Sequence, residues 1–320
     1  MITVVIPYYQ RSPGILRKAL ASVAAQRGCQ LPVHIIVVDD ASPALVEPEL
    51  ADAGLMHHSL QVIVQPNGGP GAARNTGLDN ASPDTRYIAF LDSDDEWMPD
   101  HLARAVAALK CGYDFYFADH LQLGQTISAF VRASRIKINE HPLLPTPTVG
   151  LHAYQGDMFD QIIRGNVIGT STVMYDFERF RERRFYIEFA NAGEDYLYWM
   201  ELTARDARIA FSSNVEATYG RGVNVYSGSG WGTEQHMLRL HNELRYKKTI
   251  GRLYNVTPTQ RRHIHASIGQ LREAFARDLL HRLTHRKPMS LKLLASHFAL
   301  DPMSYLLLPS SALHLLTKRA

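Results

Sequence analysis

The first 120 residues alternate short apolar runs with stretches of helical pattern. The runs are rich in β-branched and aromatic residues and are apolar almost without interruption, which is typical of parallel strands covered by helices on both faces. This alternation predicts an α/β fold with right-handed crossovers between its strands. The predicted strands are residues 2–6, 33–38, 60–64, 87–91 and 113–118, and the predicted helices lie near 13–26, 43–53, 70–81 and 99–110.

The segments that directly follow the predicted strands carry aromatic, acidic and glycine residues. They are Pro7-Tyr8-Tyr9, Asp39-Asp40, Asn67-Gly68-Gly69 and Asp92-Ser93-Asp94-Asp95. In an open α/β sheet, ligands bind beyond the carboxyl ends of the strands. We therefore expect these four segments to meet at one edge of the sheet and to form a site for a nucleotide and a metal.

The acidic segment is the most informative of the four. Asp92, Asp94 and Asp95 begin where an apolar strand ends, and such a cluster of like charges is costly unless a cation lies among them. Mg²⁺ and Mn²⁺ favour carboxylate and phosphate oxygens, so a metal that carries a phosphorylated ligand is the natural partner. The alternative is an exposed acidic turn that also caps the following helix.

Composition limits the class of protein. With 320 residues and 46% apolar content, the chain can bury a sizeable core in one large domain or two smaller ones. Two cysteines are too few for a disulfide framework, and residues 1–7 lack the features of a signal peptide, so we expect a cytoplasmic protein. The sequence has no run of about 18 apolar residues that would cross a membrane.

Charge is distributed unevenly along the chain. Residues 241–320 hold 14 Lys and Arg against 4 Asp and Glu, whereas residues 1–240 hold 20 against 27. A basic segment after an acidic body suggests an anionic partner, such as the inner face of the plasma membrane, and we expect no nucleic-acid partner. The apolar stretches 290–298 and 305–316 either lie in the membrane interface or pack against the catalytic domain or a second subunit.

Four motifs, in their order and spacing, resemble those of family 2 glycosyltransferases. They lie at residues 5–11, 37–42, 67–75 and 91–95, and the resemblance extends more loosely over 160–215. The stretch 222–231 looks most like bacterial exopolysaccharide enzymes of the succinoglycan type. The resemblance implies the GT-A fold, which is a Rossmann-like, mostly parallel sheet flanked by helices, here with a helical C-terminal extension.

The same resemblance suggests how the chain is divided. It implies a GT-A catalytic domain over residues 1–215, with a nucleotide-binding half at 1–120 and an acceptor half at 121–215. Residues 216–232 contain five glycines and predict a flexible Gly/Ser-rich loop. Residues 233–320 have a helical pattern and predict the basic helical extension.

The resemblance also implies a metal and donor site. The segment 92–94 is similar to the DxD motif, in which Asp94 would ligate Mn²⁺ or Mg²⁺ and Asp92 would contact the ribose or the metal shell. Arg74, in a glycine-rich turn before a helix, would add a fixed charge for phosphate. The implied donor-binding residues are Pro7, Tyr9, Arg11, Asp39, Asp40, Asn67, Gly71, Arg74, Asp92, Ser93 and Asp94.

Two of these assignments have structural alternatives. Tyr9 would offer a face on which uracil stacks, or it would be a core aromatic that closes the end of the strand. Asp40, in preference to Asp39, would accept a hydrogen bond from a base N–H, and a helix N-cap is the alternative for the other carboxylate.

Glu194 and Asp195 resemble the ED motif of the family, which implies that they are the catalytic residues. The aspartate of that motif is the general base that takes the proton of the acceptor hydroxyl. An ordinary aspartate pKa of about 3.9 would keep Asp195 ionised at neutral pH. The alternative is that both acids simply favour a helix N-terminus.

Together these features predict an inverting, non-processive transferase that moves a hexose, glucose from UDP-glucose, to an oligosaccharide or lipid-linked acceptor. Processive synthases carry a Q-x-x-R-W motif and membrane-spanning helices, whereas this chain has Gln270-Leu271-Arg272-Glu273. Two alternatives remain. One is a catalytically silent sugar-binding or scaffold subunit, and the other is a phosphatase of the haloacid dehalogenase type, whose D-x-D motif follows its first strand.

Overall fold

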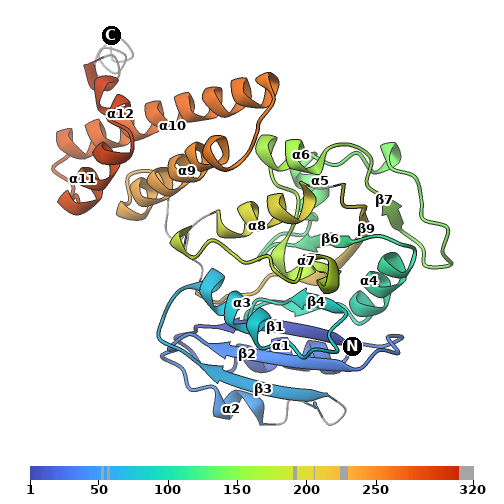
Figure 1. Ribbon diagram of the computed structural model, residues 1–320. Coiled ribbons are helices and arrows are strands. Elements are labelled where there is room, and N and C mark those ends of the chain that lie inside the picture. Colours follow the sequence, from blue (N-terminus) through green and yellow to red (C-terminus); the bar gives the residue numbers. More distant parts are fainter. Residues whose placement is uncertain (52–53, 56–57, 190–192, 205, 224–229, 310–320) are drawn as a thin grey trace. The chain divides into compact units, whose positions relative to one another are not determined.

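The computed structural model describes residues 1–51, 54–55, 58–189, 193–204, 206–223 and 230–309. The chain forms two compact units, which are described separately (Figure 1). The first comprises residues 1–190 and 194–223, and the second comprises residues 191–193 and 224–320.

The first unit is built on a sheet of nine strands with the order β3-β2-β1-β4-β8-β6-β9-β5, and β7 pairs with β9. The strands are β1 (Ile2–Tyr8), β2 (Val33–Asp39), β3 (Ser59–Val64), β4 (Tyr87–Phe90), β5 (Glu96–Trp97), β6 (Phe115–Leu121), β7 (Leu151–Ala153), β8 (Met174–Asp176) and β9 (Ile209–Thr218). The sheet is mixed, because β1 to β4 are parallel but β8, β5 and β7 run antiparallel to their neighbours.

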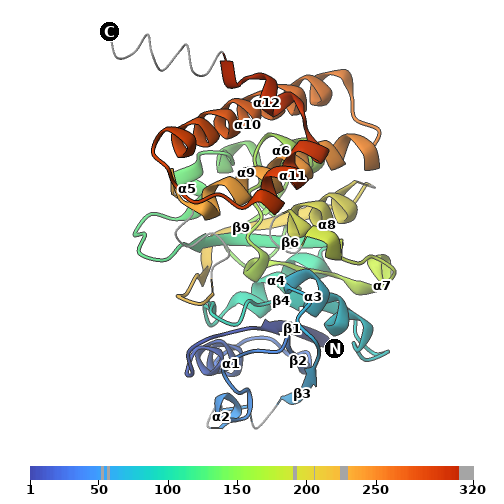
Figure 2. The same ribbon diagram turned by 90° about the vertical axis from the view of Figure 1, so that its left-hand side faces the viewer.

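Helices cover both faces of this sheet (Figures 1 and 2). Helices α1 and α4 pack on the face that holds Val33, Ile35 and Val37, whereas α3 packs against Ile36 and Val38 on the other face. Burial of both faces explains why these strands are apolar at most positions. The helices are α1 (Leu16–Ala24), α2 (Glu47–Leu50), α3 (Pro70–Asp79), α4 (His101–Lys110), α5 (Ala129–Ala133), α6 (Met158–Arg164), α7 (Phe177–Phe180) and α8 (Glu194–Thr203), with short 3₁₀ helices η1 (Ile138–Glu140), η2 (Thr170–Thr172) and η3 (Ile187–Phe189).

The predicted α/β architecture is confirmed, with two instructive differences. The helix expected near 43–53 is reduced to the four residues of α2. Strand β9 was not predicted, and residues 216–218 belong to it rather than to a loop. Its register against β6 is irregular, which hides the alternation that marks a strand in sequence. Residues 224–229 of the predicted loop lie outside the described residues.

The second unit is helical, as expected for the C-terminal extension. Its helices are α9 (Glu234–Leu253), α10 (Pro258–Thr284), α11 (Leu291–Leu300) and α12 (Met303–Leu306). Met237, Leu240, Phe275 and Leu279 form its apolar core, on which α11 packs through Leu293 and Leu294. Within the part of the chain that is described, none of the helices is long and apolar enough to traverse a bilayer.

Candidate active site

Arg74, in the first turns of α3, joins the acidic loop after β4 to the start of α8. Its Nη2 donates to Oδ1 of Asp92 at 2.7 Å, and its Nη1 lies 3.7 Å from Oε1 of Glu194. The guanidinium, 4% exposed, also lies over the ring of Phe185. Residues about 120 positions apart in the chain are therefore brought into one site. This finding places the predicted metal motif and the predicted ED motif together.

Charge balance around Arg74 favours its protonated form. Burial lowers the pKa of the guanidinium, but the negative charges of Asp92, Glu194 and Asp195 outweigh burial and raise that pKa above its usual value. Its Nε and Nη1 are buried and have no hydrogen-bond partner among the described residues. The side chain expected to bind phosphate thus already pairs with protein carboxylates and still has donors to offer.

The carboxylates of the acidic loop are held by the segment after β9. The backbone N–H of Gly222 donates to Oδ2 of Asp94 at 2.8 Å, and that of Gly220 donates to Oδ1 of Asp95 at 3.0 Å. A β-carbon on Gly220 would lie 1.6 Å from the backbone oxygen of Asp94, so only glycine fits there. Burial and the charge of Asp92 raise the pKa of Asp94.

Asp95 does not cap a helix, which was the alternative role for the acidic run. It is followed by β5, and its Oδ2 accepts a hydrogen bond from the Ser171 hydroxyl at 2.5 Å. Ser171 also accepts from the backbone N–H of Asp92 at 3.0 Å. Burial, together with the charges of Asp92 and Asp94, raises the pKa of Asp95. Asp95 therefore anchors the loop that carries the other two carboxylates.

Glu194 and Asp195 begin α8, and their pKa values depart from the ordinary ones. Burial and the neighbouring Asp195 raise the pKa of Glu194 to about 8, against the opposing charge of Arg74. Burial likewise raises the pKa of Asp195. The expectation of an ordinary pKa for Asp195 was wrong, because sequence alone does not show burial. Gly71 explains how Glu194 fits: a β-carbon there would lie 3.3 Å from Cγ of Glu194.

Asp40 fixes the glycine-rich turn. Its carboxylate accepts from the backbone N–H groups of Gly68 and Gly69, each at 2.8 Å, and from the side chain of Gln65. Asn67 donates to the backbone oxygen of Asp40. The Asp40 carboxylate, which was expected to accept a hydrogen bond from a nucleobase, thus already accepts three hydrogen bonds from protein groups. The neighbouring Asp39 accepts from the backbone N–H of residue 42 at 2.7 Å.

The remaining predicted donor residues lie around the end of β1. Tyr9 is partly exposed, whereas Tyr8 is fully buried and is the aromatic that closes this strand. Pro7 belongs to β1, and Arg11 is exposed just beyond it. Ser93 is buried and accepts a hydrogen bond from the Gln10 amide, while the Gln10 carbonyl accepts from the backbone N–H of Val223.

Sequence reasoning missed two residues that hold this site together. Gln10 connects the end of β1 to the acidic loop and to the segment after β9, and Ser171 connects that loop to η2. Both are common polar residues with no distinctive spacing. Only their burial and their several partners identify them.

The acidic loop suits a divalent metal. Among the described residues, no group of three or more His, Cys, Asp or Glu side chains is arranged to hold a metal alone. Burial and then the charge of Asp92 raise the pKa of Asp94, and a cation between the two carboxylates would offset both effects. Two carboxylates completed by phosphate oxygens are an ordinary set of Mg²⁺ ligands.

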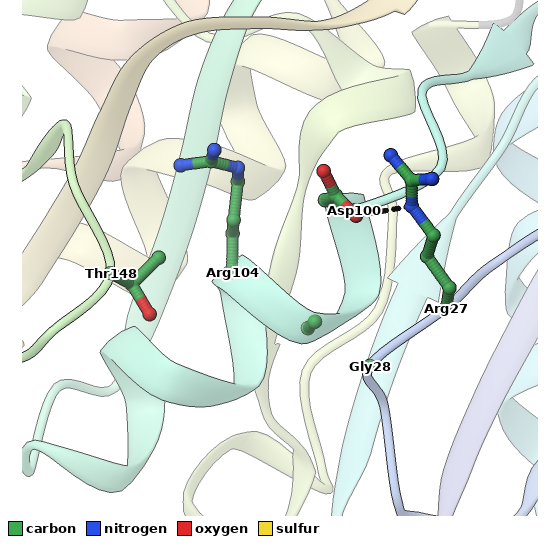
Figure 3. A pocket seen from close by; sticks show the side chains of 6 residues that line it. Arg27, Gly28, Asp100, Arg104 and Thr148 are labelled. Atoms are coloured by element: carbon green, nitrogen blue, oxygen red, sulfur yellow. Dashed lines mark hydrogen bonds and ion pairs between the residues drawn. The ribbon is translucent and has the colours of Figure 1, made fainter.

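A pocket of about 420 Å³ lies elsewhere in the first unit (Figure 3). Arg27 and Asp100, paired at 2.9 Å, line it together with Arg104 and Thr148. None of its lining residues belongs to the predicted site. The candidate active site is therefore the edge of the sheet around Arg74.

Comparison with solved structures defines the class of fold. TarS of S. aureus, residues 1–349 in complex with UDP, matches 88% of this chain and 72% of its own with a TM-score of 0.54 and 18% identity. Mannosyltransferase PcManGT from Pyrobaculum calidifontis, in complex with GDP-Man and Mn²⁺, matches 97% and 84% with a TM-score of 0.57 and 17% identity. The fold is of the GT-A type.

Sequence comparison gives the family. Glycosyl transferase family 2 matches residues 3–174. Succinoglycan biosynthesis protein ExoW of Rhizobium meliloti (strain 1021) is 33% identical over 318 residues, which cover 94% of each chain. ExoO of the same organism is 31% identical over 71% of this chain and 62% of its own length. The chain therefore belongs to glycosyl transferase family 2 and is a nucleotide-sugar glycosyltransferase.

Proposed function

We propose that the protein transfers one hexose, glucose from UDP-glucose, to a hydroxyl of an oligosaccharide or lipid-linked acceptor in exopolysaccharide synthesis. Similarity to ExoW and ExoO, both named for succinoglycan biosynthesis, supports the product class. The observation that carries the proposal is the position of Arg74 between Asp92 and Glu194. This contact supports a single site that combines the proposed leaving-group and base residues.

In this mechanism Asp195 is the general base. The acceptor oxygen attacks the anomeric carbon from the face opposite UDP, and its proton passes to the Asp195 carboxylate. The bond between the anomeric carbon and the diphosphate oxygen breaks, so the configuration inverts and no covalent sugar–enzyme intermediate forms. The raised pKa of Asp195 favours this role, because a carboxylate with a higher pKa is a stronger base at neutral pH.

Asp94 and Asp92 would hold Mn²⁺ or Mg²⁺ at the diphosphate. The metal, when bound, supplies positive charge that stabilises the departing UDP. Arg74 contributes a second, fixed charge, because a guanidinium stays protonated at neutral pH and the charges around it raise its pKa further. Gly222 and Gly220 orient the acidic loop through their backbone N–H groups.

Donor choice can be tested by binding and by turnover. Thermal shifts with UDP-, GDP- and dTDP-sugars and Mn²⁺ should be largest for UDP-glucose, because a ligand that binds only the folded state raises its melting temperature. UDP-glucose turnover should stop in EDTA and in Asp94→Asn. Asp100→Asn, a carboxylate paired with Arg27 outside the site, is the matched control. Binding without turnover in any condition would instead favour a scaffold subunit.

The second unit is proposed to contact an anionic membrane surface. On α11 and α12, Leu291, Phe298 and Leu306 are 80%, 57% and 68% exposed, and Lys292 stands beside Leu291. His297, also on α11, is fully buried. Exposed apolar side chains among basic residues are typical of helices that lie in a membrane interface. Such a contact would bring the enzyme to a lipid-linked acceptor.

Vesicle flotation tests this contact. The double variant Leu291→Ser/Phe298→Ser should lose binding to vesicles that contain phosphatidylserine, while the unchanged chain floats with them. Val149→Ser is the matched control, since Val149 is equally exposed at 80% but lies in the first unit. Flotation that is the same for all three proteins, or absent for all three, would refute the membrane role.

A further inference from the structure

A tyrosine and a histidine that are not among the predicted site residues lie against each other beside the acidic loop. Tyr219 directly follows β9, and His120 lies in β6, the parallel neighbour of β9. Their rings are stacked, with centroids 4.4 Å apart and planes 18° apart. The register of the two strands shifts on both sides of Asp119. Such irregularities re-aim side chains and are frequent next to active sites.

The two side chains pack closely against Gly169. A β-carbon on Gly169 would lie 2.6 Å from the Tyr219 hydroxyl oxygen and 2.9 Å from Nδ1 of His120. His120 is 5% exposed, and its Nδ1 has no hydrogen-bond partner within the described residues. A buried polar atom without a partner is unfavourable, so its position beside the phenol requires an explanation.

Tyr219 adjoins the acidic loop, because the backbone N–H of the next residue, Gly220, donates to Oδ1 of Asp95 at 3.0 Å. Burial and the negative charges of Asp95, Asp92 and Asp195 raise the pKa of this phenol well above its usual value. A phenol with an ordinary pKa of about 10 is protonated at neutral pH and can donate a hydrogen bond. Asp92 and Asp95 belong to the acidic loop, which would hold the metal at the diphosphate, and Asp195 is the proposed base. The phenol therefore lies near both the metal-binding loop and the base. As a whole residue, Tyr219 is partly exposed.

We propose that Tyr219 is a sugar-binding residue of this active site, whose hydroxyl donates a hydrogen bond to a hydroxyl of the transferred hexose. His120 is a positioning residue that holds the phenol ring by stacking. The inference rests on the proposed function. Only in that transfer reaction does a hexose lie between the diphosphate of UDP and the Asp195 base. Glycine at position 169 is required, since any side chain there would displace the phenol.

Tyr219→Phe tests the proposal, because it removes the hydroxyl and keeps the stacked ring. With Mn²⁺, the affinity for UDP alone should stay within about twofold, whereas kcat/KM for UDP-glucose should fall about tenfold, the usual effect of one hydrogen bond. Tyr154→Phe is the matched control. Tyr154 also stacks on a histidine, His141, at 4.9 Å, but the acids of the active site do not act on its phenol.

Two further variants separate positioning from folding. His120→Ala should reduce kcat/KM as Tyr219→Phe does, and His120→Phe should restore most of it by restoring the stack. Gly169→Ala should resemble Tyr219→Phe, and the two together should lose little more, because both act on the same hydroxyl. Melting temperatures identify any variant that fails to fold.

Three outcomes would overturn the proposal, and they are distinguishable. Unchanged kcat/KM in Tyr219→Phe would remove Tyr219 from the sugar site and leave the proposed function intact. Equal weakening of UDP and UDP-glucose would assign the phenol to the nucleotide instead. A wild-type protein that neither binds UDP nor turns over any UDP-hexose would remove the proposed function, and this inference with it.

Discussion

Each of the two units buries a cluster of charged side chains. Acidic side chains outnumber basic ones in the cluster of the first unit, and basic side chains outnumber acidic ones in the cluster of the second. Around Arg74 in the first unit, carboxylates outnumber cations, and the pKa of Glu194 is raised to about 8. In the second unit, Asp301, 1% exposed, accepts from both Arg272 nitrogens at 2.7 and 2.8 Å and pairs with Lys248 at 2.8 Å.

The difference shows in the direction of the pKa shifts. Burial raises the pKa of Asp301, but hydrogen bonds from Arg272, Lys248 and Ser304 outweigh burial and hold it well below the ordinary range. A carboxylate with a lowered pKa stabilises the folded state at neutral pH, whereas one with a raised pKa destabilises it. In the second cluster the protein itself supplies enough cations for the carboxylate of Asp301. In the first cluster carboxylates are in excess, which suits a cationic ligand. Carboxylates with raised pKa values, such as those of the first cluster, are typical of functional sites.

The largest expected effect is on turnover in the first cluster. Asp195→Asn removes the proposed base and should lower turnover by about 10²–10⁴-fold, the usual contribution of positioned proton transfer. Its melting temperature should stay the same or rise, because one of the repelling carboxylates becomes neutral. Steady-state kinetics and a thermal melt on the same preparation check both statements. A variant that keeps its turnover would show that the base is another group.

The opposite result is expected for the second cluster. Asp301→Asn leaves two cations without their carboxylate and should cost about 3–5 kcal/mol of unfolding free energy, as loss of one partner of a buried pair does. Urea denaturation measures this loss, with Asp100→Asn, which removes only an exposed pair, as the control. If both variants unfold at the same urea concentration, the Asp301 cluster does not stabilise the fold.

A pH dependence distinguishes the clusters further. Burial and the neighbouring His241 lower the pKa of His297 from 6.5 to about 4. Between these values the unfolded chain binds a proton that the folded chain does not, so stability should fall by about 3 kcal/mol as the pH drops from 6.5 to 4. Above pH 6.5 this histidine has no effect.

Denaturation midpoints across this pH range test the prediction. His297→Gln should flatten the curve, while His265→Gln, an exposed histidine on α10, should leave it unchanged. The other groups that face His297 are Asp301 and Lys248, whose charges act in opposite directions on its pKa. A wild-type curve without slope between pH 6.5 and 4 would show that His297 is not buried in neutral form.

The smallest effect is expected at Gly71. A β-carbon there would approach Cγ of Glu194 to 3.3 Å, which a shift of a few tenths of an ångström would relieve. Gly71→Ala should therefore reduce turnover less than tenfold and leave UDP binding unchanged. Gly68→Ala, in the same turn but facing Ala72 at 2.8 Å instead of α8, is the comparison. A loss as large as that of Asp195→Asn would mean that α8 cannot adjust at all.

Much of the first unit was predictable because its information is local. The apolar runs gave β1 to β4 nearly to their observed ends, and the acidic and glycine-rich segments were expected at the carboxyl edge of the sheet. The ED pair was expected at a helix start, where α8 begins. Each of these signals depends on residues that are close in sequence. Their hydrophobic periodicity and their turn- and cap-forming residues can be recognised without the structure.

Strand β9 and its consequences depended on the tertiary structure. Its residues alternate poorly because the strand is irregular against β6, and its place in the sheet is fixed by contacts with β6 residues 94 to 97 positions away. That placement brings Tyr219, Gly220 and Gly222 to the acidic loop. Burial there also sets the raised pKa values of Asp94 and Asp195, which their residue types alone do not predict.

The sequence by itself thus determined which residues can do the chemistry, since carboxylates, glycines and an arginine have their properties wherever they stand. The tertiary structure decided which of them meet and in what state of protonation. Arg74 shows the distinction. Its charge is evident from sequence, but its position between Asp92 and Glu194 follows only from the packing of α3 against the start of α8. Contacts between residues so far apart in the chain depend on the whole fold, because residues that are close in sequence do not indicate them.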